Sequence, residues 1–144
     1  MSAQMKCGPS GGIGGENFVD TLPPTKMKIK EVLVWYEDTV EAIQVTWSDN
    51  SKSDKHGKGN ANPTSFTLRD DEYLVSISGR YGKSLDRITL ITTKGQEKSF
   101  GGEGGDVEFY YNVDPTYSQA HIIGFFGRAG DVIDAIGCIF SVEK

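Results

Sequence analysis

The chain has 144 residues, with 15 Lys and Arg against 20 Asp and Glu, and its formal net charge is −5. This length predicts a single domain over residues 1–144, and the acidic balance argues against nucleic acid as a partner, because a phosphate backbone attracts a basic face. No apolar run approaches the ~18 residues of a membrane span, and the N-terminus lacks an apolar signal core. We therefore expect no membrane insertion and a cytoplasmic or non-classically exported protein.

Apolar residues recur with a period of two along most of the chain, and β-branched and aromatic residues are prominent among them. In chain order the alternating residues are Val32 and Val34; Ile43, Val45 and Trp47; Phe66 and Leu68; Tyr73, Val75 and Ile77; Ile88 and Leu90; Phe109 and Tyr111; Ile123 and Phe125; and Ile136, Cys138, Phe140 and Val142. No stretch of ten or more residues carries a helical stripe with caps. The pattern predicts an all-β fold, with residues 48–63 as a hairpin tip or a long polar loop.

Three segments of the chain align without gaps, at residues 34–44, 79–89 and 127–137. An acidic residue recurs in them at Glu41, Asp86 and Asp134, so the steps are 45 and 48 residues. Glycine-rich loops also recur, at residues 11–15 and 101–105, with a degenerate third at residues 57–59. Three copies of a four-stranded unit predict three sheets around a pseudo-threefold axis, which also protects the sheet edges.

These segments resemble the jacalin-related lectins. The resemblance lies in Gly8–Gly15, where Ser10 replaces the family's aromatic residue, in Asp71–Gly79, in Ile88–Gly95 and, most closely, in Ile123–Gly137. It covers essentially the whole chain and implies a β-prism I fold of three four-stranded Greek-key sheets. It also implies binding of a carbohydrate without a metal or other cofactor.

The resemblance places the sugar between the N-terminal glycine-rich loop and the C-terminal Gly-x-x-x-Asp segment, at Gly14, Gly15, Gly130, Asp131, Val132 and Asp134. A sugar hydroxyl both donates and accepts, so a site without calcium needs a carboxylate acceptor and backbone N–H donors. Asp134 would accept from two hydroxyls, and the N–H groups of Asp131 and Val132 would donate. We expect Gly130 to allow the turn by taking a positive φ, and Gly15 to let its backbone approach the sugar.

The repeat predicts a possible second site around the central Gly-x-x-x-Asp segment, at Lys83, Ser84, Asp86, Gly104 and Gly105. Asp86 would be the acceptor there, and the N–H groups of Lys83, Ser84 and Gly105 would be the donors. The alternative is a repeat that kept its fold and lost binding. The third copy departs further, because Glu37 replaces the glycine and Glu41 replaces the aspartate.

The resemblance also bears on specificity, because galactose binders of this family are usually cleaved just after a short N-terminal segment, which frees an amino group at the site. Residues 11–15 are uninterrupted here, which favours mannose- or glucose-containing glycans or glycoproteins as partners, with galactose as the alternative. A shallow site of this kind binds a monosaccharide with a dissociation constant near ~1 mM. Useful avidity then requires several sites per chain or a homo-oligomer, a dimer or tetramer.

The same residues give less support to other functions. Asp131 and Asp134 lie on one turn and cannot flank a glycosidic bond, so we expect no enzyme. Neither residues 101–106 nor residues 49–60 match a calcium loop. The main rival is a β-prism interaction or scaffold module that has lost glycan binding.

Several single residues carry weaker expectations. His56 and His121 are expected at the surface or an edge, and Tyr117, Phe125 and Phe126 in the core. Cys7 and Cys138 are expected to be two thiols, or a bridge if neighbouring strands carry them in an oxidising environment.

Overall fold

The computed structural model describes residues 2–23, 27–59, 62–113 and 119–143. These residues form twelve strands: β1 (Ser2–Gly11), β2 (Glu16–Val19), β3 (Ile29–Tyr36), β4 (Val40–Trp47), β5 (His56–Gly57), β6 (Thr64–Thr67), β7 (Leu74–Tyr81), β8 (Leu85–Thr92), β9 (Glu97–Gly101), β10 (Val107–Asn112), β11 (His121–Ala129) and β12 (Ile133–Glu143). Over the same ranges there is no helix long and apolar enough to cross a membrane.

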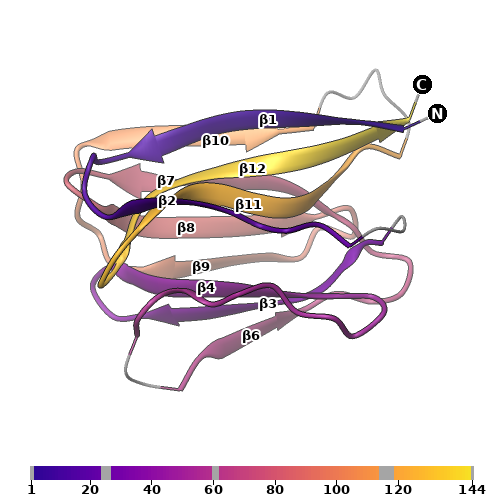
Figure 1. Cartoon of the computed structure of the whole chain (residues 1–144), viewed down its shortest axis with the longest axis horizontal. Coiled ribbons are helices and arrows are strands. Elements are labelled where there is room, and N and C mark those ends of the chain that lie inside the picture. Colours follow the sequence, from indigo (N-terminus) through magenta and orange to yellow (C-terminus); the bar gives the residue numbers. More distant parts are fainter. Residues whose placement is uncertain (1, 24–26, 60–61, 114–118, 144) are drawn as a thin grey trace.

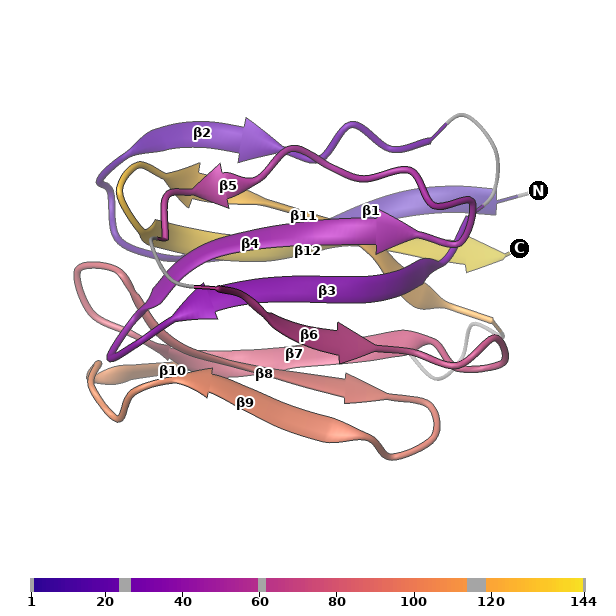
Figure 2. The ribbon, with the colours of Figure 1, turned by 90° about the horizontal axis from the view of Figure 1, so that it is seen from below.

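The strands form three four-stranded sheets that run along the long axis of the molecule (Figures 1 and 2). Sheet I has the order β1-β12-β11-β2, sheet II has β5-β4-β3-β6, and sheet III has β10-β7-β8-β9. A hairpin forms the centre of each sheet. The two edge strands also follow each other in the chain but lie on opposite sides of the sheet, and we call these two strands with their connecting loop the outer hairpin. The predicted all-β prism is confirmed. Sheet I differs in its connectivity, because its central hairpin comes from the C-terminal part of the chain and its edges from the N-terminal part.

The three central hairpins turn in the same way. The first N–H of each turn donates to the carbonyl two residues later, from Glu37 to Thr39 at 3.0 Å, from Gly82 to Ser84 at 3.1 Å and from Gly130 to Val132 at 3.0 Å. The strand register also shifts at the same place before each turn, after Trp35, Arg80 and Arg128. The sequence repeat is therefore a repeat of backbone geometry.

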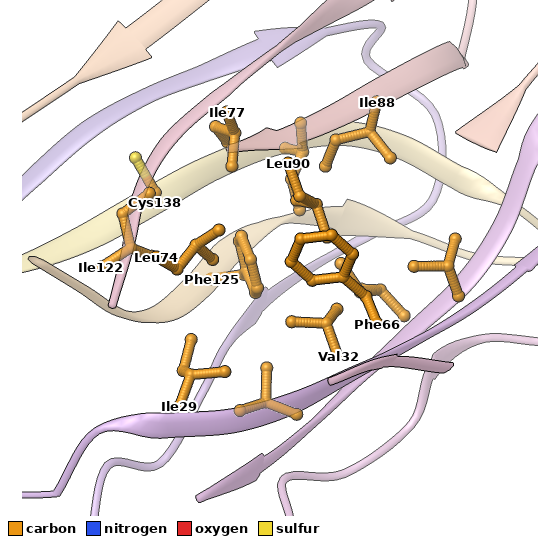
Figure 3. Packing of buried hydrophobic residues seen from close by; sticks show 14 of the residues in the cluster. Ile29, Val32, Phe66, Leu74, Ile77, Ile88, Leu90, Ile122, Phe125 and Cys138 are labelled. Atoms are coloured by element: carbon orange, nitrogen blue, oxygen red, sulfur yellow. The ribbon is translucent and has the colours of Figure 1, made fainter. Parts of the chain in front are cut away.

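Side chains from all three sheets fill a single core (Figure 3). Its fully buried members include Val32, Phe66, Ile77, Ile88, Leu90, Ile122, Phe125 and Ile136. Most of the alternating residues predicted from the sequence face inward, but β7 is an exception. Leu74 is 1% exposed whereas Tyr73 is 38% exposed, because the register shifts between Leu74 and Ser76 and moves the buried face by one residue.

Phe125 and Phe126 lie on opposite sides of sheet I. Phe125 is fully buried, as predicted, whereas Phe126 is half-buried, with Lys6 Nζ 5.3 Å above its ring centroid. The expectation for Tyr117 falls outside the described residues. Cys7 and Cys138 face each other across β1 and β12 as free thiols. Burial, with a smaller contribution from Cys7, raises the pKa of the Cys138 thiol.

Polar contacts join sheet I to sheet II, and they involve His56, which was expected at the surface or an edge. The carboxylate of Asp20, itself buried, accepts the Phe125 N–H at 2.8 Å and lies 2.6 Å from His56 Nε2. The His56 ring stacks on Phe18 at 4.0 Å. Nearby, Trp47 Nε1 donates to the Ile123 carbonyl at 2.8 Å.

The two histidines were expected at the surface or at an edge. His56 lies on the edge strand β5, as expected, although its side chain is only 11% exposed. The expectation was wrong for His121, which is 7% exposed at the start of the central strand β11. Each histidine packs against an aromatic ring, Phe18 for His56 and Tyr73 for His121. These contacts join segments far apart in the chain, and no local pattern marks them.

We predict that Asp20→Ala lowers the free energy of unfolding by about 2–4 kcal/mol, because it leaves a buried N–H and a buried imidazole without their acceptor. Chemical denaturation of both proteins measures the difference. Asp106→Ala, which removes an exposed carboxylate, is the control and should change the free energy of unfolding by less than about 0.5 kcal/mol. Equal effects from the two substitutions would show that Asp20 does not join the sheets.

Candidate functional site

The turns of the three central hairpins and the loops that join β1 to β2 and β9 to β10 gather at one end of the prism, opposite the chain termini (Figure 1). The residues predicted to bind sugar all lie at this end. They form two clusters, which we call site 1 (Gly14, Gly15, Gly130, Asp131, Val132 and Asp134) and site 2 (Lys83, Ser84, Asp86, Gly104 and Gly105). Each cluster combines a glycine-rich loop of an outer hairpin with the turn of a central hairpin.

In site 1 the loop between β1 and β2 lies against the carboxylate of Asp134. A Cβ atom added to Gly14 would lie 2.8 Å from Asp134 Oδ1, and one added to Gly15 would lie 2.5 Å from Oδ2. Gly15 also has a φ of 69°, a conformation that side chains rarely allow. The loop therefore needs glycine at position 15, where an added Cβ would also lie 2.6 Å from the Ala129 carbonyl carbon. At position 14 glycine lets the backbone lie directly against the carboxylate.

An arginine that the sequence analysis did not single out fixes this loop. Arg128 Nε donates to the Gly14 carbonyl at 3.0 Å and Arg128 Nη2 to the Gly15 carbonyl at 2.7 Å. Its third nitrogen, Nη1, donates to Asn17 Oδ1 at 2.9 Å. A planar guanidinium suits this task, because its N–H groups have fixed directions. Arg128 is thus a positioning residue for site 1.

Burial raises the pKa of the Asp134 carboxyl above its ordinary value. The positive charge of Arg128 opposes this shift, and the negative charge of Asp131 adds to it. The Asp131 side chain itself is exposed and pairs with Lys58 Nζ at 3.0 Å, so only its backbone N–H belongs to the site. A partly desolvated carboxylate is a strong hydrogen-bond acceptor for hydroxyl groups.

Site 2 repeats this geometry on sheet III. Cβ atoms added to Gly104 and Gly105 would lie 3.0 Å from Asp86 Oδ1 and 2.8 Å from Asp86 Oδ2, and Gly105 has a φ of 86°. Arg80 takes the part of Arg128, since its Nε and Nη2 donate to the Gly105 carbonyl at 3.1 and 2.8 Å. The two arginines stand two residues before their Gly-x-x-x-Asp segments, and this recurrence was the available sequence signal.

The expectation that Gly130 takes a positive φ was wrong. The positive φ values of the two sites belong to Gly15 and Gly105, and Glu37 makes the same turn hydrogen bond as Gly130. A Cβ on Gly130 would lie 3.4 Å from Gly15 Cα and 4.0 Å from Asp134 Oδ2. Glycine here therefore keeps the space beside the carboxylate open.

The third copy does not reproduce the two sites. Trp35 occupies the place of Arg80 and Arg128, with Lys55 Nζ 4.3 Å above its ring centroid. A Cβ on Gly59 would meet Trp35 Cβ at 2.5 Å, so this loop packs on an indole ring. The residues that would correspond to Gly14 and Gly15 fall outside the described ranges.

Within residues 2–23, 27–59, 62–113 and 119–143, no group of three or more His, Cys, Asp or Glu side chains is placed to hold a metal ion. The available chemistry in both sites is a carboxylate acceptor beside exposed backbone amides.

The model of the family described as "Jacalin-like lectin domain" matches residues 7–139. The chain belongs to this family. Jacalin-like lectins bind carbohydrates and are not enzymes, so the family places this chain among carbohydrate-binding proteins.

Three curated lectins illustrate how this jacalin-like chain relates to whole proteins. Horcolin of Hordeum vulgare is 32% identical over 147 residues, which cover 95% of this chain and 97% of horcolin. Jacalin-related lectin 5 of Arabidopsis thaliana is 29% identical over 118 residues, 79% of this chain but 16% of that protein. A mannose/glucose-specific lectin of Parkia platycephala is 29% identical over 149 residues, 95% of this chain and 32% of that protein. The chain thus spans nearly all of some relatives and a small part of others.

Solved lectin structures share the fold over the whole domain. The artocarpin–mannotriose complex has a TM-score of 0.82 at 26% identity and covers 95% of this chain and 97% of artocarpin. Wild-type Malaysian banana lectin has a TM-score of 0.78 at 27% identity, with 96% and 98% covered.

We predict that Asp131→Asn lowers the pKa of the Asp134 carboxyl, because the substitution removes a neighbouring negative charge that raises it. The carboxyl carbon resonance of Asp134, followed by NMR from neutral to acid pH, reports this pKa. Asp106→Asn removes a carboxylate away from site 1 and should leave it unchanged. An unshifted titration in Asp131→Asn would show that the two carboxylates do not interact.

Proposed function

We propose that the protein is a metal-independent lectin for mannose- or glucose-containing glycans, and that site 1 is its primary sugar site. The observation that carries this proposal is the approach of Gly14 and Gly15 to the Asp134 carboxylate, where added Cβ atoms would lie 2.8 Å and 2.5 Å from its two oxygens. A loop this close lets backbone amides reach a ligand that the carboxylate holds.

The chemistry of site 1 matches a pair of adjacent hydroxyl groups. The two oxygens of Asp134 accept two hydroxyl hydrogens, and the N–H groups of Gly15, Asp131 and Val132 donate to the hydroxyl oxygens. Each hydroxyl is then both a donor and an acceptor, so no polar group of the sugar loses its hydration uncompensated. No cation is needed, because the carboxylate and the amides supply both roles.

Preference for mannose or glucose has two supports. The chain is continuous from β1 through the loop to β2, whereas galactose binders that resemble it are usually cleaved in this segment. Artocarpin, which shares the fold, was solved with mannotriose, and the relative from Parkia is described as specific for mannose and glucose. Galactose is the alternative that the experiment below must exclude.

Site 2 is proposed as a second site for the same class of sugar. Its carboxylate, its glycine loop and its arginine repeat those of site 1 in kind and in contact, with Asp86, Gly105 and Arg80 in place of Asp134, Gly15 and Arg128. A repeat that served only the fold would need neither the glycine pair nor the open space beside the carboxylate, since the third copy folds with Glu41 and Trp35. This comparison favours binding over the scaffold alternative.

The amides of Gly14, Gly15, Gly104 and Gly105 report the two sites separately in ¹⁵N NMR titrations, which suits dissociation constants near ~1 mM. With a chelator present, methyl α-mannoside should shift all four amides, and methyl α-galactoside should shift none at the same concentration. Asp134→Asn should weaken site 1 by at least ~100-fold and leave site 2 unchanged, because it removes a charged acceptor of two hydrogen bonds. Asp86→Asn should have the opposite pattern.

Asp131→Asn is the matched control for site 1, because it keeps the backbone N–H and should change the affinity by less than about threefold. Shifts at Gly14 and Gly15 alone would overturn the second site and leave the first. Shifts with galactoside but not mannoside would overturn the sugar preference. No shift with either sugar, in a protein that is folded by NMR, would make the scaffold alternative the better account.

The weakness of single sites also leads us to propose a homo-oligomer, in which several copies of sites 1 and 2 act together. Light scattering coupled to size exclusion should give twice or four times the mass of the 15.7 kDa chain. A mass of one chain at micromolar concentration would overturn this part of the proposal. Sites 1 and 2 of a single chain would then be the remaining source of avidity.

A further inference from the structure

The outer face of sheet III carries a groove of about 570 Å³, lined by Ser78, Arg80, Arg87, Thr89, Glu108 and Tyr110 among others. This volume lies in the range of small-ligand sites, about 300–1,000 Å³. The groove runs along β10, β7 and β8, on the side of the sheet away from the core.

The strand register arranges the lining in two rows across the sheet. Glu108, Arg80 and Arg87 form one row, and Tyr110, Ser78, Thr89 and Ser99 form the next. Neighbours in a row point to the same face, so charged groups and hydroxyls lie side by side with the Tyr110 ring, which is 62% exposed. The groove therefore joins hydrogen-bonding groups to an open aromatic surface.

The pseudo-threefold repeat shows that the fold does not require these residues. The place of Arg87 is taken by Ala135 in sheet I and by Ala42 in sheet II, and both alanines are buried. The place of Ser78 is taken by Phe126 and Leu33, which are larger and apolar. Only sheet III combines a small residue in the second row with an arginine in the first, and this combination makes the groove.

The two arginines of the groove differ in their contacts. Arg80 already has partners, because it donates to the Gly105 carbonyl and forms an ion pair with Glu108 at 2.8 Å. Arg87 is half-buried, and within the described part of the chain its guanidinium has no hydrogen bond or ion pair. Arginine has five N–H donors in a planar fork that matches the oxygens of a carboxylate or a sulfate. Arg87 is thus a charge without a counter-ion in a site of ligand size.

We propose that this groove binds a sugar residue that carries one anionic group, either a carboxylate or a sulfate. Arg87 would hold the anionic group, Ser78 and Thr89 would bond to ring hydroxyls, and the Tyr110 ring would cover the apolar face of the sugar. The groove lining includes neither Asp86 nor Asp134, although it shares Arg80 with the loop of site 2. The inference does not rest on the function proposed for sites 1 and 2.

The charge around the groove limits the ligand to one anionic group. The whole chain has a net charge of −5, and Glu97 lies two residues before Ser99 on the same edge strand. Such surroundings disfavour a polyanion, whose further charges would meet carboxylates rather than cations. A single acidic or sulfated sugar meets one free arginine.

The test compares methyl β-glucuronide and glucose 6-sulfate with methyl β-glucoside, in NMR titrations that follow the Arg87 Nε–Hε signal and the Ser78 and Thr89 amides. We expect both anionic sugars, or one of them, to bind at least ~10-fold more tightly than the neutral glucoside. The sugar that binds more tightly shows whether the groove recognises a carboxylate or a sulfate. The affinity should fall in 0.5 M salt, because the contact is ionic.

Two variants suit the fold because the other sheets already carry the substituted residue at the equivalent position. Arg87→Ala has its counterpart in Ala135 and Ala42. Tyr110→Val has its counterpart in Val19, which pairs with β11 as Tyr110 pairs with β7. Arg87→Ala should weaken the anionic sugars at least ~10-fold and leave mannoside shifts at Gly14 and Gly15 unchanged. Tyr110→Val should weaken them less, and the double variant Asp86→Asn with Asp134→Asn should not affect them.

Four outcomes overturn the inference. They are equal binding of the neutral glucoside, undiminished binding in Arg87→Ala, loss of binding in the Asp86 and Asp134 double variant, and equal binding of inorganic sulfate. The third would assign the anionic sugars to sites 1 and 2, and the last would reduce the groove to a simple anion site. Failure of mannoside to bind sites 1 and 2 would leave the inference untouched.

Discussion

The pairing of β1 with β12 is the interaction on which the rest of the structure depends. It runs from Ser2 opposite Glu143 to Gly11 opposite Ala135, and it converts a C-terminal hairpin into a sheet equivalent to the other two. The Gly12 N–H then donates to the Asp134 carbonyl at 2.8 Å, which starts the glycine loop directly above the Asp134 side chain. The backbone pairing that closes the prism therefore also builds site 1, and no separate scaffold is needed for binding.

Most of the architecture could be predicted because the repeat and the period of two are strong local signals. Ile88 and Leu90 face the core as expected, and the three acidic positions mark three equivalent turns. The short edge strands β5 and β9 are poor in apolar residues, so alternation does not reveal them. The position of the buried face on β7 depends on a register shift after Leu74, and the burial of His56 depends on Phe18 and Asp20 from another sheet. Neither can be read from a local stretch of sequence.

The candidate sites were also predicted only in part. The sequence predicted which loop and turn meet at each carboxylate, because the residue types recur. It assigned the wrong role to Gly130, since a glycine that leaves space and one that takes a positive φ look identical in a sequence. It also missed Arg80 and Arg128, whose partners are backbone carbonyls in distant loops and carry no residue-type signature. The symmetry of the fold supplies what a single sequence lacks, because each sheet serves as a control for the other two.

The connectivity of sheet I has a consequence for biosynthesis. Sheet III is formed by four consecutive strands, so all the residues of site 2 have been translated before β11 begins. Site 1 needs the loop between β1 and β2 together with the turn between β11 and β12, so it cannot assemble until β12 has been synthesised and has paired with β1. The order of synthesis therefore places the completion of the site 2 cluster before that of the site 1 cluster.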